Sequence, residues 1–400
     1  MAVRNHLILI LIIFLVFAAG CSIAGRGSQF TVPAPSTAVT MVPSSTPVSP
    51  TGAVIPTINT PGINQAITTP TQVASPTSTI TPTPTENEID FEVGREITID
   101  YLRNMEISGS EITFEAGLSH ASNYQQHLVS YISEGNKIYG LLTIPDGEPP
   151  DGGFKAIVFN HGYIPPADYR TTERYTAYID HLARNGFVVF KIDYRGHGES
   201  QGEPSGSYFS PGYTIDSISA FKSLQMMELV DPQGIGMWGH SMAGNLVLRA
   251  MLIEADIKAG VIWSGAVYSY DDLVKYGITD NTYRPPATAE TPEDSDQRSR
   301  SREILDDYGW PDTQVDYWKA VSLTENIEHL NNPLQLHHAE DDPVVNIVYS
   351  IDLAAVLQEN DKEFELYSYE GGGHNLASPY FNQAILRTVE FFQNNLGSED

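Results

Sequence analysis

The chain carries Gly239-His240-Ser241-Met242-Ala243-Gly244 directly after an apolar run over residues 235–238 and directly before a helix-like run over residues 245–252. This order predicts a short strand, a tight turn centred on Ser241 and then a helix. A serine on such a strained turn needs small neighbours, and the glycine and alanine residues beside it are small. The free N–H groups and the positive dipole end of the helix would face an oxygen that becomes negative beside the serine. Ser241 is therefore the candidate nucleophile.

The turn departs from the usual G-x-S-x-G pattern at Ala243, where glycine is the usual residue. A single methyl group fits there if the neighbouring strand leaves room for it. A glycine–serine turn before a helix can also be an ordinary helix N-cap. The motif alone therefore leaves a structural role for Ser241 open, and residues elsewhere must decide.

Residues 1–20 have the layout of a secretory signal. Arg4 and His6 precede an apolar stretch over residues 7–18, and small residues lead to Cys21. A charged start, a short apolar core and small residues at a cleavage point define such signals. Cys21 resembles the cysteine of the bacterial lipobox, which is lipidated and becomes the mature N-terminus.

We therefore expect a lipoprotein signal and lipidation of Cys21. Simple secretion and an uncleaved anchor are the alternatives, although the apolar core is short against the ~20 residues of a spanning helix. All three place the rest of the chain outside the cytoplasm. Cys21 is the only cysteine, so no thiol is left for a disulfide, and the folded part must be stable by its core alone.

Residues 21–87 are predicted to form a disordered tether. Most of this segment consists of Thr, Pro, Ser, Val, Ala and Ile, a composition that cannot bury enough apolar surface to offset the ordering entropy. It would hold a globular domain away from a membrane, and it also suits a glycosylated stalk. The net charge of −28, from 50 acidic and 22 basic residues, argues against nucleic acid or an anionic surface as a partner.

Strand and helix patterns alternate from residue 88 onward. An antiparallel start is predicted over residues 111–114, 126–132 and 137–145, which alternate as half-buried strands do. Apolar runs typical of strands buried on both faces follow over residues 156–160, 187–192, 235–238, 259–263 and 333–337, and a last strand over 363–369. Helices are predicted between them over residues 169–184, 214–229, after Ser241, 344–358 and 380–394. This alternation predicts an α/β fold with a mainly parallel, doubly wound sheet.

The predicted domains are an N-terminal extension with short strands over residues 88–130 and a catalytic domain over residues 131–400. Within it, residues 268–330 break the alternation, being polar, acidic and proline-bearing. We expect a cap inserted over the strand ends, with a loop over residues 285–302. Its aromatic residues either form the core of the insert or line a pocket; they are Trp310, Tyr317 and Trp318.

A serine hydroxyl needs an imidazole to take its proton and a carboxylate to orient that imidazole. In a sheet of this type the acid and then the histidine should follow the serine, each on a loop after a strand. Asp342 follows the strand at 333–337, and His374 follows the strand at 363–369. The sequence therefore predicts Asp342 and His374 as partners of Ser241.

Other interpretations of these residues stay open. Asp342 could cap the helix after it, His374 could be a loop histidine in a glycine turn, and Asp341 or Glu340 could be the acid instead. Asp341 and Glu340, together with His337 and His338, also suggest a metal site. These four residues do not have the spacing of metal ligands on a helix, however, and neighbouring residues on a strand point to opposite faces. We expect no metal and no cofactor.

The developing oxyanion needs two backbone donors. One is the N–H of Met242, directly after the serine. The other should come from the loop after an earlier strand, and His161-Gly162-Tyr163 follows the strand at 156–160. We therefore expect the N–H of Tyr163 to be the second donor and His161 to be a structural turn residue.

Taken together, these residues resemble the α/β-hydrolase superfamily, and particularly the catalytic domain of the prolyl oligopeptidase family, close to the dienelactone hydrolase and serine aminopeptidase branches. The resemblance covers residues 131–396. It includes the segment from Asp193 to Ser200, whose Asp193, Arg195 and Glu199 we expect to be structural. It implies an α/β-hydrolase fold with a cap inserted before the strand that carries the acid. Prolyl oligopeptidases usually carry a large β-propeller before this domain, and here only the short extension at residues 88–130 precedes it.

The resemblance implies an extracytoplasmic serine hydrolase that forms an acyl-enzyme on Ser241. On resemblance alone we favour a peptidase, with a carboxylesterase as the alternative; a non-catalytic tethered binding protein on the same scaffold is the alternative of another class. The expected partners are a small peptide or acyl ester as substrate and a membrane through Cys21. The sequence does not indicate an oligomeric state.

Overall fold

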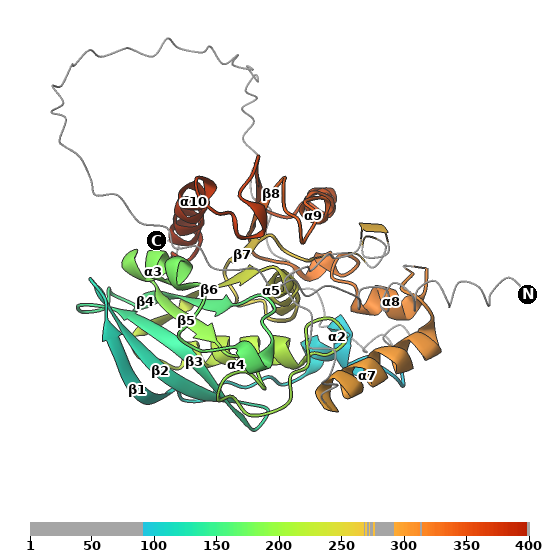
Figure 1. Ribbon diagram of the computed structural model, residues 1–400, viewed down its shortest axis with the longest axis horizontal. Coiled ribbons are helices and arrows are strands. Elements are labelled where there is room, and N and C mark those ends of the chain that lie inside the picture. The colour runs from blue at the N-terminus through green and yellow to red at the C-terminus, as the bar shows by residue number, and fades with distance from the viewer. Residues whose placement is uncertain are drawn as a thin grey trace, which may run out of the picture. The chain divides into compact units, whose positions relative to one another are not determined.

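The computed structural model describes residues 91–397, with gaps at 268, 270–271, 273–274, 277–291 and 313. The predicted signal, Cys21 and the tether lie outside the described residues. One mixed sheet runs in the order β1-β2-β3-β5-β4-β6-β7-β8-β9 (Figure 1). Its strands are β1 Thr113–His120, β2 Tyr124–Ser133, β3 Asn136–Pro145, β4 Phe154–Asn160, β5 Val188–Ile192, β6 Val230–His240, β7 Gly260–Trp263, β8 Leu334–Ala339 and β9 Phe364–Tyr369.

The sheet has an antiparallel part and a parallel part. β1, β2 and β3 pair antiparallel, and β3 joins β5 in the same sense. The strands from β5 across β4 to β9 are all parallel. Parallel strands bring their carboxyl ends to one edge, so the loops after β4, β6, β8 and β9 meet there. This edge is where the sequence places the candidate site.

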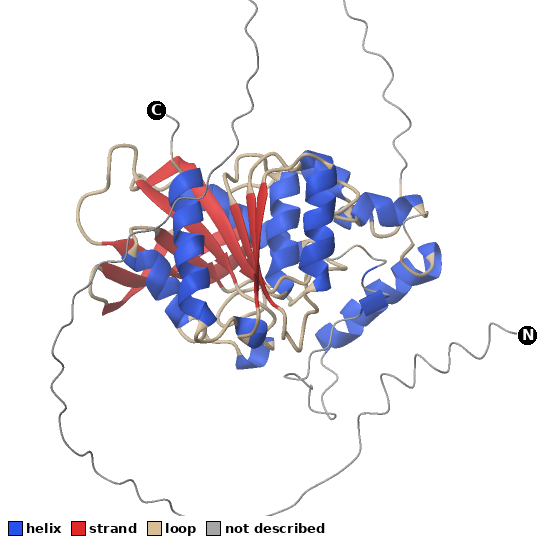
Figure 2. Cartoon of the chain, turned by 90° about the horizontal axis from the view of Figure 1, so that it is seen from above, coloured by secondary structure: helices blue, strands red, loops and turns tan. Residues whose placement is uncertain are grey.

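Helices cover both faces of the parallel part (Figure 2). The helices are α2 Ile99–Asn104, α3 Thr176–Arg184, α4 Gly212–Gln225, α5 Met242–Ile253, α7 Pro292–Tyr308, α8 Asp316–Val321, α9 Val348–Glu359 and α10 Tyr380–Asn395. Alternate residues of β4 enter different cores: Phe159 packs with α3 and α10, while Val158 packs with α4, α5 and α9. The predicted doubly wound α/β fold is confirmed. None of the described helices is long and apolar enough to cross a membrane.

The helix predicted over residues 169–184 is half as long in the structure, because α3 begins only at Thr176. The residues before it are held by polar contacts with the buried end of β5. Asp193 accepts hydrogen bonds from the hydroxyls of Tyr169 and Thr171, and Lys191 Nζ donates to the Glu173 carbonyl. These tertiary contacts prevail over the local helical pattern.

The cap also differs from its prediction. The loop expected over residues 285–302 is wrong from residue 292 onward, where α7 begins; residues 285–291 lie outside the described part. Tyr317 and Trp318 are fully buried, whereas Trp310 is 63% exposed. The two buried aromatics form a core that the cap shares with the chain before α2: Tyr308 and Tyr317 donate to the carbonyls of Val93 and Gly94.

Candidate active site

Ser241 lies between the end of β6 and the start of α5, with φ 57° and ψ −120°. Positive φ is costly for a residue with a side chain, and it persists only where the surroundings enforce it. Here the Ser241 N–H donates to the Trp263 carbonyl over 3.0 Å, and the Ser241 carbonyl accepts from the N–H groups of Gly244 and Ala266. Hydrogen bonds to the start of α5 and to the segment around the end of β7 therefore fix the turn in the conformation that the sequence predicts.

Two of the glycines around Ser241 have no room for a side chain. A Cβ on Gly239 would lie 2.5 Å from the Ala243 carbonyl oxygen, and one on Gly244 would lie 2.8 Å from the Gly265 Cα. Ala243 itself is fully buried in the core beneath α5. The departure from the common pattern at Ala243 is therefore accommodated, and the tight positions are Gly239 and Gly244.

His374 and Asp342 come together as the sequence predicts. His374 Nδ1 lies 2.8 Å from Asp342 Oδ2, and the carboxylate is fully buried while the imidazole is 16% exposed. Gly372 lies just before the short helix that carries His374. Its φ of 106° is a backbone conformation that favours glycine. This contact orients the imidazole with Nε2 left for a reacting group.

The Asp342 carboxylate accepts four contacts in all. Oδ1 receives the N–H groups of Val344 at 2.8 Å and Val345 at 3.0 Å, and Oδ2 lies 3.3 Å from His338 Nε2 besides His374. Burial raises the pKa of this carboxyl, but the hydrogen bonds from His338 and His374 outweigh it and hold the pKa well below its usual 3.8. Asp342 therefore both caps the turn after β8 and presents a fixed negative charge to His374.

The alternative acids do not contact the imidazole. Asp341 Oδ1 accepts the N–H of Gly373 over 2.8 Å and so braces the histidine loop, and Glu340 is exposed. Of the two histidines of β8, His337 contacts Gln335 and Tyr369, and His338 contacts Ser350 and the Val345 carbonyl besides Asp342. Among the described residues no group of three or more His, Cys, Asp or Glu side chains is arranged to hold a metal ion.

The loop that carries His374 contacts the turn at Ser241 through His240, the residue before the serine. His240 Nε2 lies 2.8 Å from the His374 carbonyl oxygen, and the centroids of the two rings are 4.7 Å apart. Within the described part of the chain, no hydrogen bond joins Ser241 Oγ to His374. Catalytic contacts of this kind often tighten only when substrate binds.

The loop that carries the expected oxyanion donor lies against the same turn. Asn160, the last residue of β4, pairs in register with Gly239 of β6, so Gly162 and Tyr163 emerge beside Ser241. A Cβ on Gly162 would lie 3.1 Å from the His240 carbonyl oxygen. Met242 is the first residue of α5, where an N–H has no acceptor within the helix. The two expected donors, Tyr163 and Met242, therefore follow the adjacent ends of β4 and β6.

His161 is a turn residue, as expected. Its ring is fully buried and stacks on Tyr169, and Nδ1 lies 2.7 Å from the Gly162 carbonyl, to which it donates. Burial, together with nearby His197, holds the pKa of His161 well below its usual range. A neutral, buried imidazole in this position shapes the loop rather than taking up protons.

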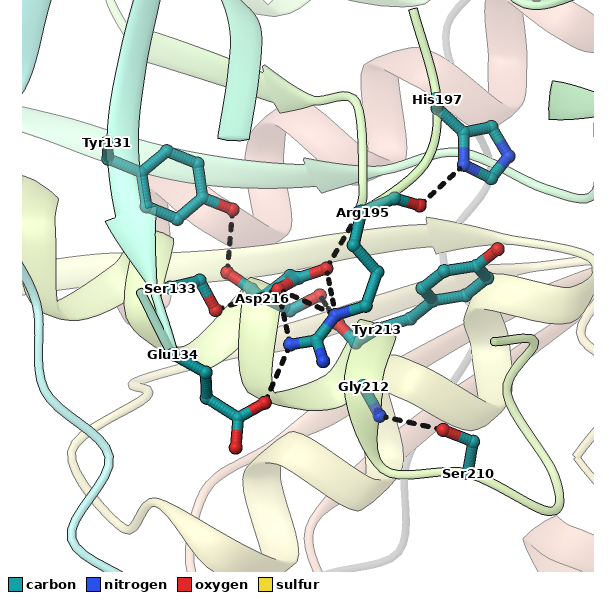
Figure 3. Close-up of polar contacts among 10 residues, drawn as sticks. Tyr131, Ser133, Glu134, Arg195, His197, Ser210, Gly212, Tyr213 and Asp216 are labelled. Atoms are coloured by element: carbon teal, nitrogen blue, oxygen red, sulfur yellow. Dashed lines mark hydrogen bonds and ion pairs between the residues drawn. The ribbon is translucent and has the colours of Figure 1, made fainter. Parts of the chain in front are cut away.

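Two of the polar residues from Asp193 to Ser200 serve the structure. Arg195 donates from Nη2 to Asp216 Oδ1 over 2.8 Å and pairs with Glu134 over 2.9 Å, while Ser133 and the backbone N–H of Arg195 also donate to Asp216 (Figure 3). This network joins the β2–β3 hairpin, the loop after β5 and α4. Asp193 anchors the loop before α3, as described above, and burial raises its pKa to about 6. Glu199 is exposed.

Sequence reasoning did not find three residues that brace the site. Tyr175 and Tyr178 both lie at the start of α3; the Tyr178 hydroxyl donates to the Asn375 carbonyl in the histidine loop over 2.8 Å, and the Tyr175 hydroxyl lies 2.9 Å from His240 Nδ1. His240 stood inside the quoted motif, but nothing local indicated its partners. Since these partners lie 65 to 197 residues apart in the chain, no spacing rule could have paired them.

Comparison with known proteins agrees with the fold. Residues 154–309 match the family described as serine aminopeptidase, S33. The uncharacterized peptidase YtmA of Bacillus subtilis is 25% identical over 278 residues, which are 69% of this chain and 96% of YtmA. Human protein ABHD12B is 24% identical over 258 residues, and the match spans 62% of each protein.

Solved structures of low sequence identity share the architecture. An acetyl xylan esterase from Paenibacillus sp. R4 gives a TM-score of 0.53 at 17% identity, over 73% of this chain and 92% of the esterase. A Pyrococcus horikoshii acylaminoacyl peptidase gives 0.53 at 17% identity, over 70% of this chain and 43% of the peptidase. With the sheet order and the turn at Ser241, these matches show that the chain has the α/β-hydrolase fold.

Proposed function

We propose that this protein hydrolyses an acyl bond through an acyl-enzyme on Ser241, with His374 and Asp342 as its catalytic partners. The observation that carries the proposal is the 2.8 Å contact between His374 Nδ1 and the fully buried Asp342 carboxylate. It stands beside a serine whose backbone is held at positive φ on a strand-to-helix turn. A histidine oriented by a buried carboxylate is the arrangement that activates a serine hydroxyl.

The reaction follows from these positions. Ser241 Oγ attacks the substrate carbonyl carbon as its proton passes to His374 Nε2, and the N–H groups of Tyr163 and Met242 stabilise the oxygen that becomes negative. His374 then gives the proton to the leaving amine or alcohol, and the acyl group remains on Ser241. Water, deprotonated by the same imidazole, releases the acid and restores the serine. Asp342 keeps the proton on Nδ1 and stabilises the imidazolium.

A peptide bond is the first candidate for the bond that is cut. The family match is to serine aminopeptidases, and YtmA, which is described as a peptidase, is matched over nearly its whole length. An acyl ester is the second candidate, because the chain covers 92% of the Paenibacillus esterase but only 43% of the Pyrococcus peptidase.

Parallel initial rates test both candidates. Purified protein is given a set of aminoacyl amides and short-chain acyl esters, with the Ser241→Ala variant measured under the same conditions. A peptidase hydrolyses at least one aminoacyl amide at a rate that Ser241→Ala abolishes, whereas an esterase hydrolyses the esters and none of the amides. Turnover of an activated ester by Ser241→Ala at the wild-type rate would contradict the acyl-enzyme. If neither wild type nor Ser241→Ala hydrolyses any substrate, a binding role is favoured.

We also propose that the enzyme works outside the cytoplasm on a lipid anchor at Cys21. The support is the sequence alone: an apolar stretch ends in Ala18-Ala19-Gly20-Cys21, and a Thr- and Pro-rich segment follows. Expression of the full chain in a bacterial host with a radiolabelled fatty acid should label the protein and place it in the membrane fraction. Cys21→Ser should remove the label. Wild-type protein without label, free in the medium, would argue for simple secretion.

A further inference from the structure

Three hydrogen bonds connect the oxyanion loop to the histidine loop. The Gly162 N–H donates to Tyr175 Oη over 3.0 Å, Tyr175 Oη lies 2.9 Å from His240 Nδ1, and His240 Nε2 lies 2.8 Å from the His374 carbonyl oxygen. The two loops are more than two hundred residues apart in the sequence. Tyr175 and His240 therefore form a bridge between the segments that flank Ser241.

Only one arrangement of protons satisfies the bridge. A carbonyl oxygen can only accept, so His240 carries its proton on Nε2 and donates to His374. Burial and the neighbouring His374 lower the pKa of His240 to about 3, and the ring is therefore neutral, with Nδ1 as an acceptor. Tyr175 donates to that nitrogen, because burial raises the pKa of its hydroxyl to about 12. A lone pair of Oη then accepts the Gly162 N–H.

The backbone is shaped to make this bridge. Tyr175 has φ 52° and Arg174 before it has φ 58°, two consecutive left-handed residues with side chains. The loop approaches so closely that a Cβ on Gly162 would lie 2.9 Å from Tyr175 Oη and 3.2 Å from His240 Nδ1. Strain of this kind persists where the surrounding structure requires it and is concentrated at functional sites.

We propose that Tyr175 is a positioning residue, which acts through His240 to hold the oxyanion loop and the His374 loop in register about Ser241. The inference rests on the proposed Ser241 chemistry. That chemistry needs donors within about 3 Å of the oxyanion and an imidazole at hydrogen-bond distance from Oγ. Both loops contain glycine, Gly162 in one and Gly371, Gly372 and Gly373 in the other, so contacts from other segments help to hold their geometry. The hydroxyl of Tyr175 is bonded to the oxyanion loop and to His240, and His240 in turn is bonded to the His374 loop.

Tyr124 supplies a matched control. Its hydroxyl donates to Asp180 Oδ1 over 3.0 Å, so it also contacts α3, but it lies in β2 and not in the bridge. Tyr124→Phe removes a hydroxyl that hydrogen-bonds a residue of α3, and Tyr175→Phe removes the hydroxyl of the N-cap residue of α3. Loss of helix support alone would make the two variants similar, whereas loss of the bridge affects Tyr175→Phe alone.

The test measures steady-state hydrolysis of an activated short-chain ester by the full chain. Wild type is measured first, with covalent labelling of Ser241 by a fluorophosphonate, so that failure of the proposed function is recognised before any variant is made. Tyr175→Phe should lower kcat about 10- to 100-fold with KM within about twofold, because the hydrogen bonds of the bridge hold the groups that stabilise the transition state. Tyr124→Phe should stay within about twofold of wild type in both constants.

His240→Gln supplies the second arm. Glutamine keeps an N–H donor for the His374 carbonyl but offers no acceptor at the place of Nδ1, so it breaks the bridge from the other side. The double variant should be about as slow as the slower single variant, since both remove one interaction. Equal kcat for Tyr175→Phe and Tyr124→Phe, or losses that multiply in the double variant, would overturn the inference. If Tyr175→Phe does not fold, wild-type kcat in His240→Gln would overturn it instead.

Discussion

Replacing Asp342 by Asn tests the buried carboxylate at the centre of the site. In the wild type, Oδ1 accepts two backbone N–H groups and Oδ2 accepts from His374 Nδ1 and lies 3.3 Å from His338 Nε2. An amide has one oxygen and one NH₂ group for the same donors. The backbone N–H groups cannot change, so the oxygen stays with them and the NH₂ group faces His374.

The imidazole must then present a lone pair at Nδ1 and carry its proton on Nε2. That is the nitrogen that has to take the proton of Ser241, so the base is lost while the shape of the site is kept. Loss of this tautomer costs about 10⁴ in kcat where an orienting aspartate has been replaced in a serine triad, and we expect kcat to fall by about 10³ to 10⁴ for Asp342→Asn. KM should change little.

Asp341→Asn is the matched control in the neighbouring position. Asp341 Oδ1 accepts the Gly373 N–H, and an amide oxygen can accept it equally well. We expect kcat within about threefold of wild type. Both variants are assayed on the same activated ester, and thermal unfolding confirms that each is folded. More than about a tenth of wild-type kcat in Asp342→Asn, or an equal loss in Asp341→Asn, would contradict the role of Asp342 as the orienting carboxylate.

Three further outcomes are expected. Gly239→Ala puts a methyl group 2.5 Å from a backbone oxygen and should destabilise the fold by about 1 to 3 kcal/mol in chemical denaturation, whereas Gly117→Ala, which meets nothing within 4 Å, should be neutral. Arg195→Lys loses the forked contact with Asp216 and should lower the unfolding temperature with kcat unchanged at 25 °C; a large drop in kcat would make Arg195 catalytic. The pKa values of His240 and His337 are lowered to about 3 in the folded chain, so the unfolded chain binds more protons below the usual 6.5. The free energy of unfolding should therefore fall between pH 6.5 and 3 by about 1.4 kcal/mol per pH unit for each histidine. Asp193, whose pKa is raised to about 6 in the folded chain, offsets part of this fall because it binds its proton more readily in the folded chain. A free energy of unfolding that does not change across this pH range would contradict the prediction.

The sequence predicted the parallel sheet and its order of strands and helices because apolar runs and turn residues are local signals. It also predicted the contact between Asp342 and His374, since strand order and loop position together limit where these residues can lie. The predicted roles of Ser241, Tyr163 and Met242 agree with where the structure places them, and they remain predictions until activity is measured.

The sequence failed where distant contacts prevail over local pattern. The helical periodicity over residues 169–175 is real, but the Asp193 carboxylate holds Tyr169 and Thr171 in another conformation. Tyr317 and Trp318 were expected either in a pocket or in the insert's own core; they lie in that core, but it also includes the segment before α2, which no local pattern indicated. The bridge through Tyr175 belongs to the same class, because a residue at positive φ carries no sequence signal unless it is glycine.

The identity of the residue that a fluorophosphonate modifies tests Ser241 as the nucleophile most directly. Such reagents react with a serine only when a base and an oxyanion site activate it. Peptide mapping by mass spectrometry should find one adduct, on the peptide that contains Ser241, and the adduct should be absent from His374→Ala. A folded wild-type protein with no adduct, or with its adduct on another serine, would contradict Ser241 as the nucleophile.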